Sequence, residues 1–135
     1  MMKRLMPILF IVLTFASACE KSESKLQAAD REELQAMFKE IQELSSSATC
    51  TDPEEWSFTA LGSKACGGPQ MYIAYPHAID TVAFLELVKR YTEAEKVYNQ
   101  KHNIISDCMM VMPPNGIKCQ DGEPVLVYDN TQKLN

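Results

Sequence analysis

The stretch "IDTVAFLELVKRYTEAEKVYNQKH", residues 79–102, predicts one long amphipathic helix against which the rest of the chain must pack. Asp80 is a favourable N-cap residue, and Ile79 and Phe84 have the spacing of a hydrophobic staple. Apolar side chains recur at three- and four-residue steps to form one face: Phe84, Leu87, Val88, Tyr91, Ala94 and Tyr98. We therefore predict a helix over residues 81–101, about 30 Å long, as the backbone of the core.

Strand patterns lie on both sides of this helix. Before it, residues 56–61 alternate apolar and small polar side chains, and residues 71–75 form a short run rich in aromatics that Pro76 ends. After it, the turn signals Asn115-Gly116 and Asp121-Gly122 separate three short apolar runs, at residues 109–112, 117–119 and 125–128. Asn-Gly and Asp-Gly suit tight hairpin turns, so these runs predict a three-strand antiparallel meander.

A second amphipathic helix is expected near the N-terminus, over residues 26–45, because apolar residues again recur at helical spacing there. Residues 19–25 are charged and lack apolar anchors, which is typical of a tether. The chain is therefore expected to hold a single α+β domain over residues 26–135, with a disulfide-stapled core at about residues 50–128. In this domain a small, mainly antiparallel sheet packs on one long helix.

The first residues have the parts of a secretory signal. Basic Lys3 and Arg4 precede an apolar stretch of eleven residues, 5–15, and small residues follow at 16–18. Eleven residues are too few to span a bilayer, which takes about 20. We therefore expect residues 1–18 to be a signal peptide.

Cys19 directly follows this segment. The sequence Ala-Ser-Ala-Cys resembles the lipobox of bacterial lipoproteins, in which the cysteine is acylated and becomes the new N-terminus. That family usually has Leu at the position of Ala16, and ordinary cleavage followed by simple secretion is the alternative. The resemblance implies a palmitate-type lipid anchor at Cys19 and a location in the cell envelope, at the outer membrane of a Gram-negative bacterium.

The remaining cysteines are Cys50, Cys66, Cys108 and Cys119, an even set in an exported chain. Two disulfides are therefore expected. We favour Cys66 with Cys108 and Cys50 with Cys119, while the local pairing of Cys50 with Cys66 and Cys108 with Cys119 remains open. The nearest pair has ten intervening residues, which disfavours a zinc site, and we expect neither a metal nor a cofactor.

The charge of the chain disfavours nucleic acid as a partner. Residues 1–18 hold two basic and no acidic residues, so their removal leaves 11 Lys and Arg against 18 Asp and Glu, a formal charge of −7. Such a surface repels phosphates, and the sequence has no basic stripe with interleaved aromatics.

Two groups of residues have side chains suited to chemistry. His77 and His102, the two histidines, are expected to have structural or solvated roles rather than catalytic ones. Methionines 109, 110 and 112 could form a soft site for Cu(I), but core packing is the preferred interpretation. No catalytic residue is predicted.

Two loops are the candidate binding elements. A disulfide beside Gly67-Gly68-Pro69 would hold a rigid, exposed backbone and lower the entropy cost of binding, although a tight structural turn explains the same residues. The second candidate loop contains Pro113 and Pro114.

A family resemblance rests on the cysteine contexts. The chain carries "GSKACGGPQMYIAY" (62–75), then Tyr91 and Tyr98-Asn99, Ser106-Asp107-Cys108, Pro113-Pro114 and Cys119-Gln120-Asp121-Gly122. Over about residues 50–128 it resembles a family of small secreted or lipid-anchored domains of unknown function. Related sequences often have a further cysteine pair, which is absent here, and the family implies no catalytic residues.

The sequence thus predicts a non-enzymatic binding or inhibitor-like module, tied to the membrane by lipid and directed at an envelope or extracellular protein. A structural or assembly factor of the envelope is the alternative, and an unrecognised hydrolase is the third possibility. A binding module should expose an apolar patch beside a rigid loop. An enzyme should gather perturbed titratable groups in a pocket.

Overall fold

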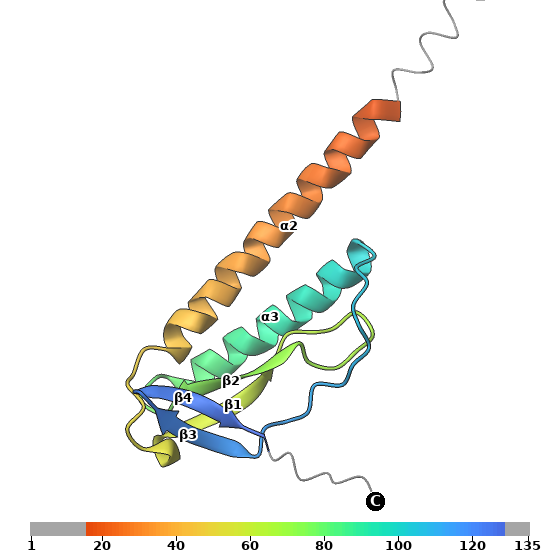
Figure 1. Cartoon of the computed structure of the whole chain (residues 1–135). Coiled ribbons are helices and arrows are strands. Elements are labelled where there is room, and N and C mark those ends of the chain that lie inside the picture. Colours follow the sequence, from red (N-terminus) through yellow and green to blue (C-terminus); the bar gives the residue numbers. More distant parts are fainter. Residues whose placement is uncertain (1–15, 129–135) are drawn as a thin grey trace, which may run out of the picture. The chain divides into compact units, whose positions relative to one another are not determined.

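The computed structural model describes the backbone of residues 16–128 and the side chains of residues 22–128 (Figure 1). Residues 1–15 of the predicted signal peptide and the side chain of Cys19 lie outside the described residues. The chain divides into two compact units, residues 1–33 and residues 34–135. The elements are α2 (Ala16–Ser45), η1 (Pro53–Glu55), β1 (Trp56–Leu61), β2 (Met71–Pro76), α3 (Thr81–Lys101), β3 (Gly116–Gln120) and β4 (Glu123–Val127). The α+β class is confirmed, as are the two disulfides.

Helix α2 begins ten residues earlier than predicted. The predicted start at Leu26 is wrong because residues 16–25 continue the helix through the segment expected to be a tether. That segment lacks an apolar face, but its Glu and Lys residues are good helix formers and no Gly or Pro occurs between residues 16 and 45. None of the helices in the described part of the chain is long and apolar enough to cross a membrane.

Helix α3 has the predicted bounds, and Asp80 caps it as predicted: its carboxylate accepts a hydrogen bond from the Ala83 N–H at 3.0 Å. Its apolar face packs on one side of the β1–β2 hairpin, along which it runs in Figure 1. The last turns of α2 complete this first cluster. Its buried members are Ile41, Leu61, Tyr75, Phe84, Leu87, Val88 and Tyr91.

The antiparallel β1–β2 pair has two covered faces because successive side chains point to opposite sides. Leu61 and Tyr75 face the helices, whereas Trp56 and Ala74 face the other way. There they meet a second cluster that includes Cys50 and the partly buried residues of the β3–β4 pair. The domain is thus layered, with helices on one side of β1–β2 and a second small sheet on the other.

The predicted three-strand meander is wrong: only the β3–β4 hairpin forms. Its turn at Asp121 and Gly122 is confirmed, and both residues have positive φ, 53° and 82°. Residues 109–112 form no strand. The Met109 N–H donates to the Asp107 carboxylate at 3.2 Å, and the Met109 carbonyl accepts from Lys64 at 2.8 Å, so side chains occupy the groups that a sheet ladder would need.

Two disulfides close the domain in the favoured pairing. Cys50 joins Cys119, with Cα atoms 5.3 Å apart, and Cys66 joins Cys108, with Cα atoms 5.7 Å apart. The first lies against the second core cluster, where Cys50 is 3% exposed. Both cysteines of the second are exposed. The local pairing is therefore not the one adopted.

Candidate functional site

A polar stripe on α3 holds the start of the loop between β1 and β2, residues 62–70. Thr92, Glu95 and Asn99 lie three and four residues apart, which places them on one side of a helix. The Thr92 hydroxyl accepts from the Gly62 N–H at 3.1 Å, and the Glu95 carboxylate accepts from the Ser63 N–H at 2.6 Å. The Asn99 amide donates to the Ser63 carbonyl at 2.7 Å. Three side chains of one helix thus fix the backbone of two consecutive residues, Gly62 and Ser63.

Gly62 makes this close approach possible. Its φ of 77° is strained for other residues, and an added Cβ would lie 2.5 Å from the Glu95 carboxylate. The same carboxylate accepts from the Tyr91 hydroxyl at 3.2 Å. Burial, and then the negative charge of Glu95, raise the pKa of Tyr91 well above its ordinary value. Tyr91 therefore remains a neutral donor.

The loop tip, residues 65–68, is exposed but held by its own backbone. The Lys64 N–H donates to the Gly68 carbonyl and the Gly67 N–H donates to the Lys64 carbonyl, each at 2.9 Å. Gly67 and Gly68 both have positive φ, 98° and 81°. No neighbouring atom lies within 4 Å of where their Cβ atoms would be, so the Cα atoms of both glycines face open space.

The tip is also tied to the connecting segment between α3 and β3, residues 102–115. The Cys66–Cys108 disulfide joins the two covalently. The Ala65 N–H donates to the Ser106 hydroxyl at 3.1 Å, and the Lys64 ammonium lies 2.6 Å from the Asp107 carboxylate. The hydrogen bond from Lys64 is the main cause that lowers the pKa of Asp107.

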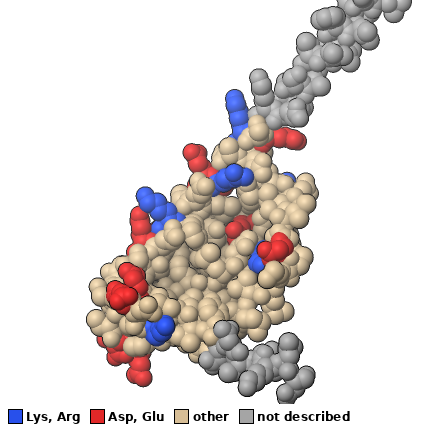
Figure 2. Space-filling view, viewed as in Figure 1, with Lys and Arg blue, Asp and Glu red and all other residues tan. Residues whose placement is uncertain are grey.

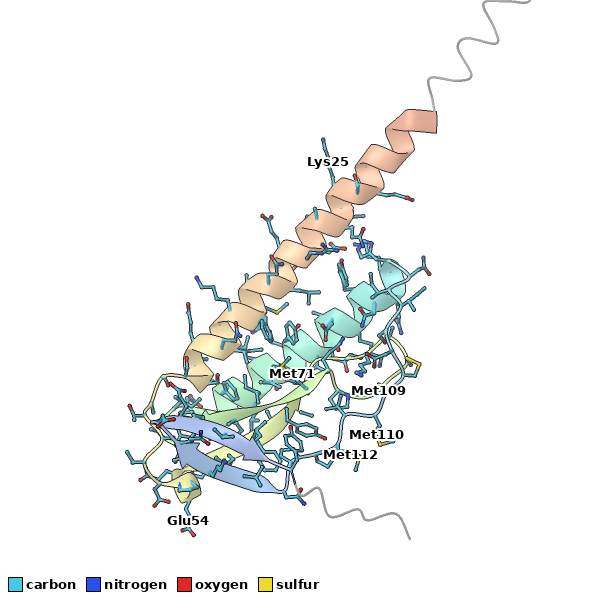
Figure 3. The ribbon with its side chains drawn as sticks, in the orientation of Figure 1. Lys25, Glu54, Met71, Met109, Met110 and Met112 are labelled. Atoms are coloured by element: carbon cyan, nitrogen blue, oxygen red, sulfur yellow. A yellow bond between two sulfur atoms is a disulfide. The ribbon has the colours of Figure 1, made fainter. Side chains whose placement is uncertain are left out.

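The connecting segment exposes large apolar side chains. The methionine patch (Met109, Met110 and Met112) is 74%, 83% and 56% exposed, and Ile105 is 93% exposed. The predicted core packing of these methionines is therefore wrong: the segment is held by its disulfide and ion pair, not by burial. Figure 3 places the patch along this segment, and Figure 2 shows a broad area of the same view where charged side chains are sparse.

The second candidate loop contributes less. Pro113 is exposed, but Pro114 is buried. Gly67 and Gly68 are exposed and Pro69 is half-buried, so the first loop is the more accessible of the two.

A cavity of about 300 Å³ lies between the loop and the C-terminal turns of α3. Its lining includes two lysines and three amide side chains but no carboxylate. The residues are Ser63, Lys64, Ala65, Gly67, Lys96, Asn99, Gln100, Asn103 and Ile104.

The two histidines lie outside this cavity's lining. His77 Nε2 lies 2.7 Å from the Ser57 hydroxyl, on an exposed part of β1–β2. The carboxylates that could have oriented His77 are engaged elsewhere, since Asp80 caps α3 and Asp107 pairs with Lys64. His102 caps the C-terminus of α3, and its ring lies against that of Tyr98. The arrangement thus gives a contact between Ser57 and His77 that neither Asp80 nor Asp107 completes.

Metal ligands of the usual kinds do not gather: the described residues contain no group of three His, Cys, Asp or Glu suited to an ion. The exposed thioethers of the methionine patch could hold only a soft ion such as Cu(I).

The polar stripe of α3 was missed in the sequence, although its spacing is visible there. Thr92, Glu95 and Asn99 follow the helical period as the apolar face does, but polar residues at such spacing usually mark a solvated side.

Comparison with known proteins adds no further guide, because no family model, curated protein or solved structure matches the chain.

Proposed function

We propose that this chain is a lipid-anchored protein of the cell envelope whose domain binds another envelope or extracellular protein without catalysing a reaction. The binding surface comprises the loop tip, residues 65–68, and the methionine patch beside it. Cys19 carries the lipid, and the outer membrane of a Gram-negative bacterium is the proposed site.

The pairing of the other cysteines supports the anchor. Cys50, Cys66, Cys108 and Cys119 bond with one another, so the domain requires no fifth cysteine. The signal-like residues before Cys19 supply the export route, and acyl chains on Cys19 would supply a stable membrane attachment.

The observation that carries the binding proposal is an exposed surface that is already rigid. Binding is weakened when flexible groups must be ordered, so a loop fixed before binding loses less entropy. Here a disulfide fixes a tip that faces solvent, and an ion pair and three hydrogen bonds with α3 fix the three residues just before it. Beside it, the flexible and polarisable methionines suit an apolar partner surface, since such side chains adapt to irregular shapes.

The test is site-specific photocrosslinking in intact cells. A photoreactive residue at Met110 should crosslink one discrete partner protein, because Met110 lies in the patch and is 83% exposed. The same residue at Glu54, which is exposed and distant from the patch in Figure 3, should not. Identical products from both positions would contradict the proposal.

A variant pair gives the matched control. Replacing all three methionines of the patch by Gln should abolish the crosslinked complex while leaving thermal stability unchanged, because exposed substitutions rarely alter stability by more than about 0.5 kcal/mol. Val82→Gln removes an apolar side chain that is 79% exposed on α3 and should leave the complex intact. Loss of the complex in both variants would indicate a general effect and refute the proposed surface.

A further inference from the structure

The cavity between the loop and α3 is a separate feature from the methionine patch, and its charge differs from that of the whole chain. The chain has a formal charge of −5, yet the cavity lining holds Lys64 and Lys96 and no acidic residue. Two acidic side chains lie close by. Asp107 pairs with Lys64, whereas Glu95 accepts from the neutral Ser63 N–H and Tyr91 hydroxyl and keeps its negative charge outside the lining.

The two lysines differ in availability. The Lys64 side chain is 11% exposed, and its ammonium contacts both Asp107 and the Met109 carbonyl. Lys96 is exposed, and within residues 22–128 it has no ion pair. Lys96 therefore supplies a positive charge at the cavity that makes no ion pair with the described carboxylates, which favours an anionic ligand.

Amide side chains complete the lining. Asn99 is 8% exposed and is fixed by its hydrogen bond to the Ser63 carbonyl. Gln100 and Asn103 are exposed and lie one and four positions after Asn99, and Asn103 has a φ of 50°. Side-chain amides both donate and accept hydrogen bonds, so the lining can pair with carboxylate and hydroxyl or amide groups of one ligand.

The volume sets the size of that ligand. About 300 Å³ is at the lower end of the range for small-molecule sites, which favours a group the size of one amino acid or one sugar. We propose that this cavity binds the carboxylate of a small polar group, with Lys96 as the charge partner and the Asn99, Gln100 and Asn103 amides as hydrogen-bond partners. The carboxylate comes either from the C-terminus of a peptide or from an acidic sugar. This inference does not depend on the methionine patch.

The experiment uses the ¹⁵N-labelled full chain in detergent micelles, titrated to millimolar concentrations with four probes. N-acetylalanine represents a peptide C-terminus and glucuronic acid an acidic sugar, while N-acetylalaninamide and glucose are their neutral counterparts. We expect saturable amide shifts at the cavity lining with at least one acid and none with its neutral counterpart. Response to N-acetylalanine alone assigns peptide C-termini, and response to glucuronic acid alone assigns acidic sugars. Absence of shifts with both acids, or equal shifts with the neutral probes, overturns the proposal.

Variants locate the site. Lys96→Gln should weaken binding of the responding acid about tenfold or more, because a charge-assisted contact is lost. Lys89→Gln removes a lysine from the same side of α3, two turns earlier and outside the cavity, and should leave the affinity unchanged. Asn103→Gly removes an amide while keeping a residue that tolerates positive φ, and should also weaken binding. Equal affinities of the Lys96 and Lys89 variants would overturn the assignment.

Acid binding at the cavity can be tested separately from partner binding at the methionine patch. The variant that lacks the methionine patch should bind the acid as the unchanged chain does, and Lys96→Gln should keep the crosslink from position 110. Loss of acid binding in the methionine variant would contradict the proposal that the cavity and the methionine patch are independent sites.

Discussion

Removing the Cys66–Cys108 disulfide, in the variant C66S/C108S, is expected to lower the free energy of unfolding by about 4 kcal/mol. The bond joins residues separated by 42 positions. In the chain-entropy model, a loop of that size restricts the unfolded chain by about this amount. The fold should survive, because Lys64–Asp107 and the hydrogen bond from Ala65 still tie the loop to the connecting segment.

Exposure predicts which disulfide reacts first in the folded protein. Cys66 and Cys108 are both exposed, whereas Cys50 is 3% exposed against Trp56 and Ala74. Thiol attack requires access to a sulfur atom. Mild dithiothreitol should therefore reduce the Cys66–Cys108 disulfide while Cys50–Cys119 stays intact.

Two measurements check these expectations. Urea unfolding followed by fluorescence of Trp56, the single tryptophan, gives the loss of stability of the variant. Alkylation after brief reduction, with peptide mass spectrometry, gives the order of reduction. A stability loss under about 1 kcal/mol would refute the entropic estimate. Earlier reduction of Cys50–Cys119 would refute the exposure argument.

Three further outcomes are expected. Glu95→Ala should lower the unfolding free energy by about 2 kcal/mol in urea titrations, because the partly buried Ser63 N–H loses a charged acceptor. Lys64 lowers the folded-state pKa of Asp107. The stability that this pair contributes is therefore present above the ordinary carboxyl pKa and is lost as pH falls through the lowered pKa. Asp107→Asn should reduce this loss of stability at acid pH, as measured by urea midpoints at a series of pH values. Cys19→Ser should prevent acylation and release the chain from membranes in cell fractionation, with both disulfides intact by mass spectrometry.

Each outcome has a control. Glu93→Ala removes an exposed carboxylate from the same helix and should change stability little, so equal losses for Glu93 and Glu95 would contradict the role of the stripe. Asp52→Asn removes a carboxylate but keeps a side-chain oxygen that can accept from the Glu54 N–H, so it is the matched control for the loss of one carboxylate. A free thiol or a misfolded chain after Cys19→Ser would contradict the lipid anchor.

The regular elements of the domain could be predicted where local signals were strong. The bounds of α3 and β1 follow from the Asp80 cap, the helical period and the alternation at residues 56–61. The Asp121-Gly122 turn was also predictable, since both residues accept positive φ. These features depend on neighbours in sequence, which a pattern records.

The connecting segment could not be predicted because its conformation depends on distant partners. Residues 109–112 have the apolar composition of a strand, but Lys64, 45 positions before Met109, binds its carbonyl. The disulfide at Cys108 further ties this segment to Cys66, 42 positions earlier. No local pattern encodes these contacts, so composition alone favoured burial of methionines that are exposed.

The loop and the connecting segment are fixed by contacts that the core does not require. In the described part of the chain, neither apolar cluster contains a residue from 62–70 or from 102–115. Packing of the core therefore does not explain why a disulfide, an ion pair and the polar stripe of α3 converge on these residues. Ordering a backbone costs about 1–2 kcal/mol per residue, so an exposed tip held without burial reduces stability unless other contacts offset it. A rigid, solvent-facing loop fits the proposed binding function, because the cost of ordering is then met during folding and not at the encounter with a partner.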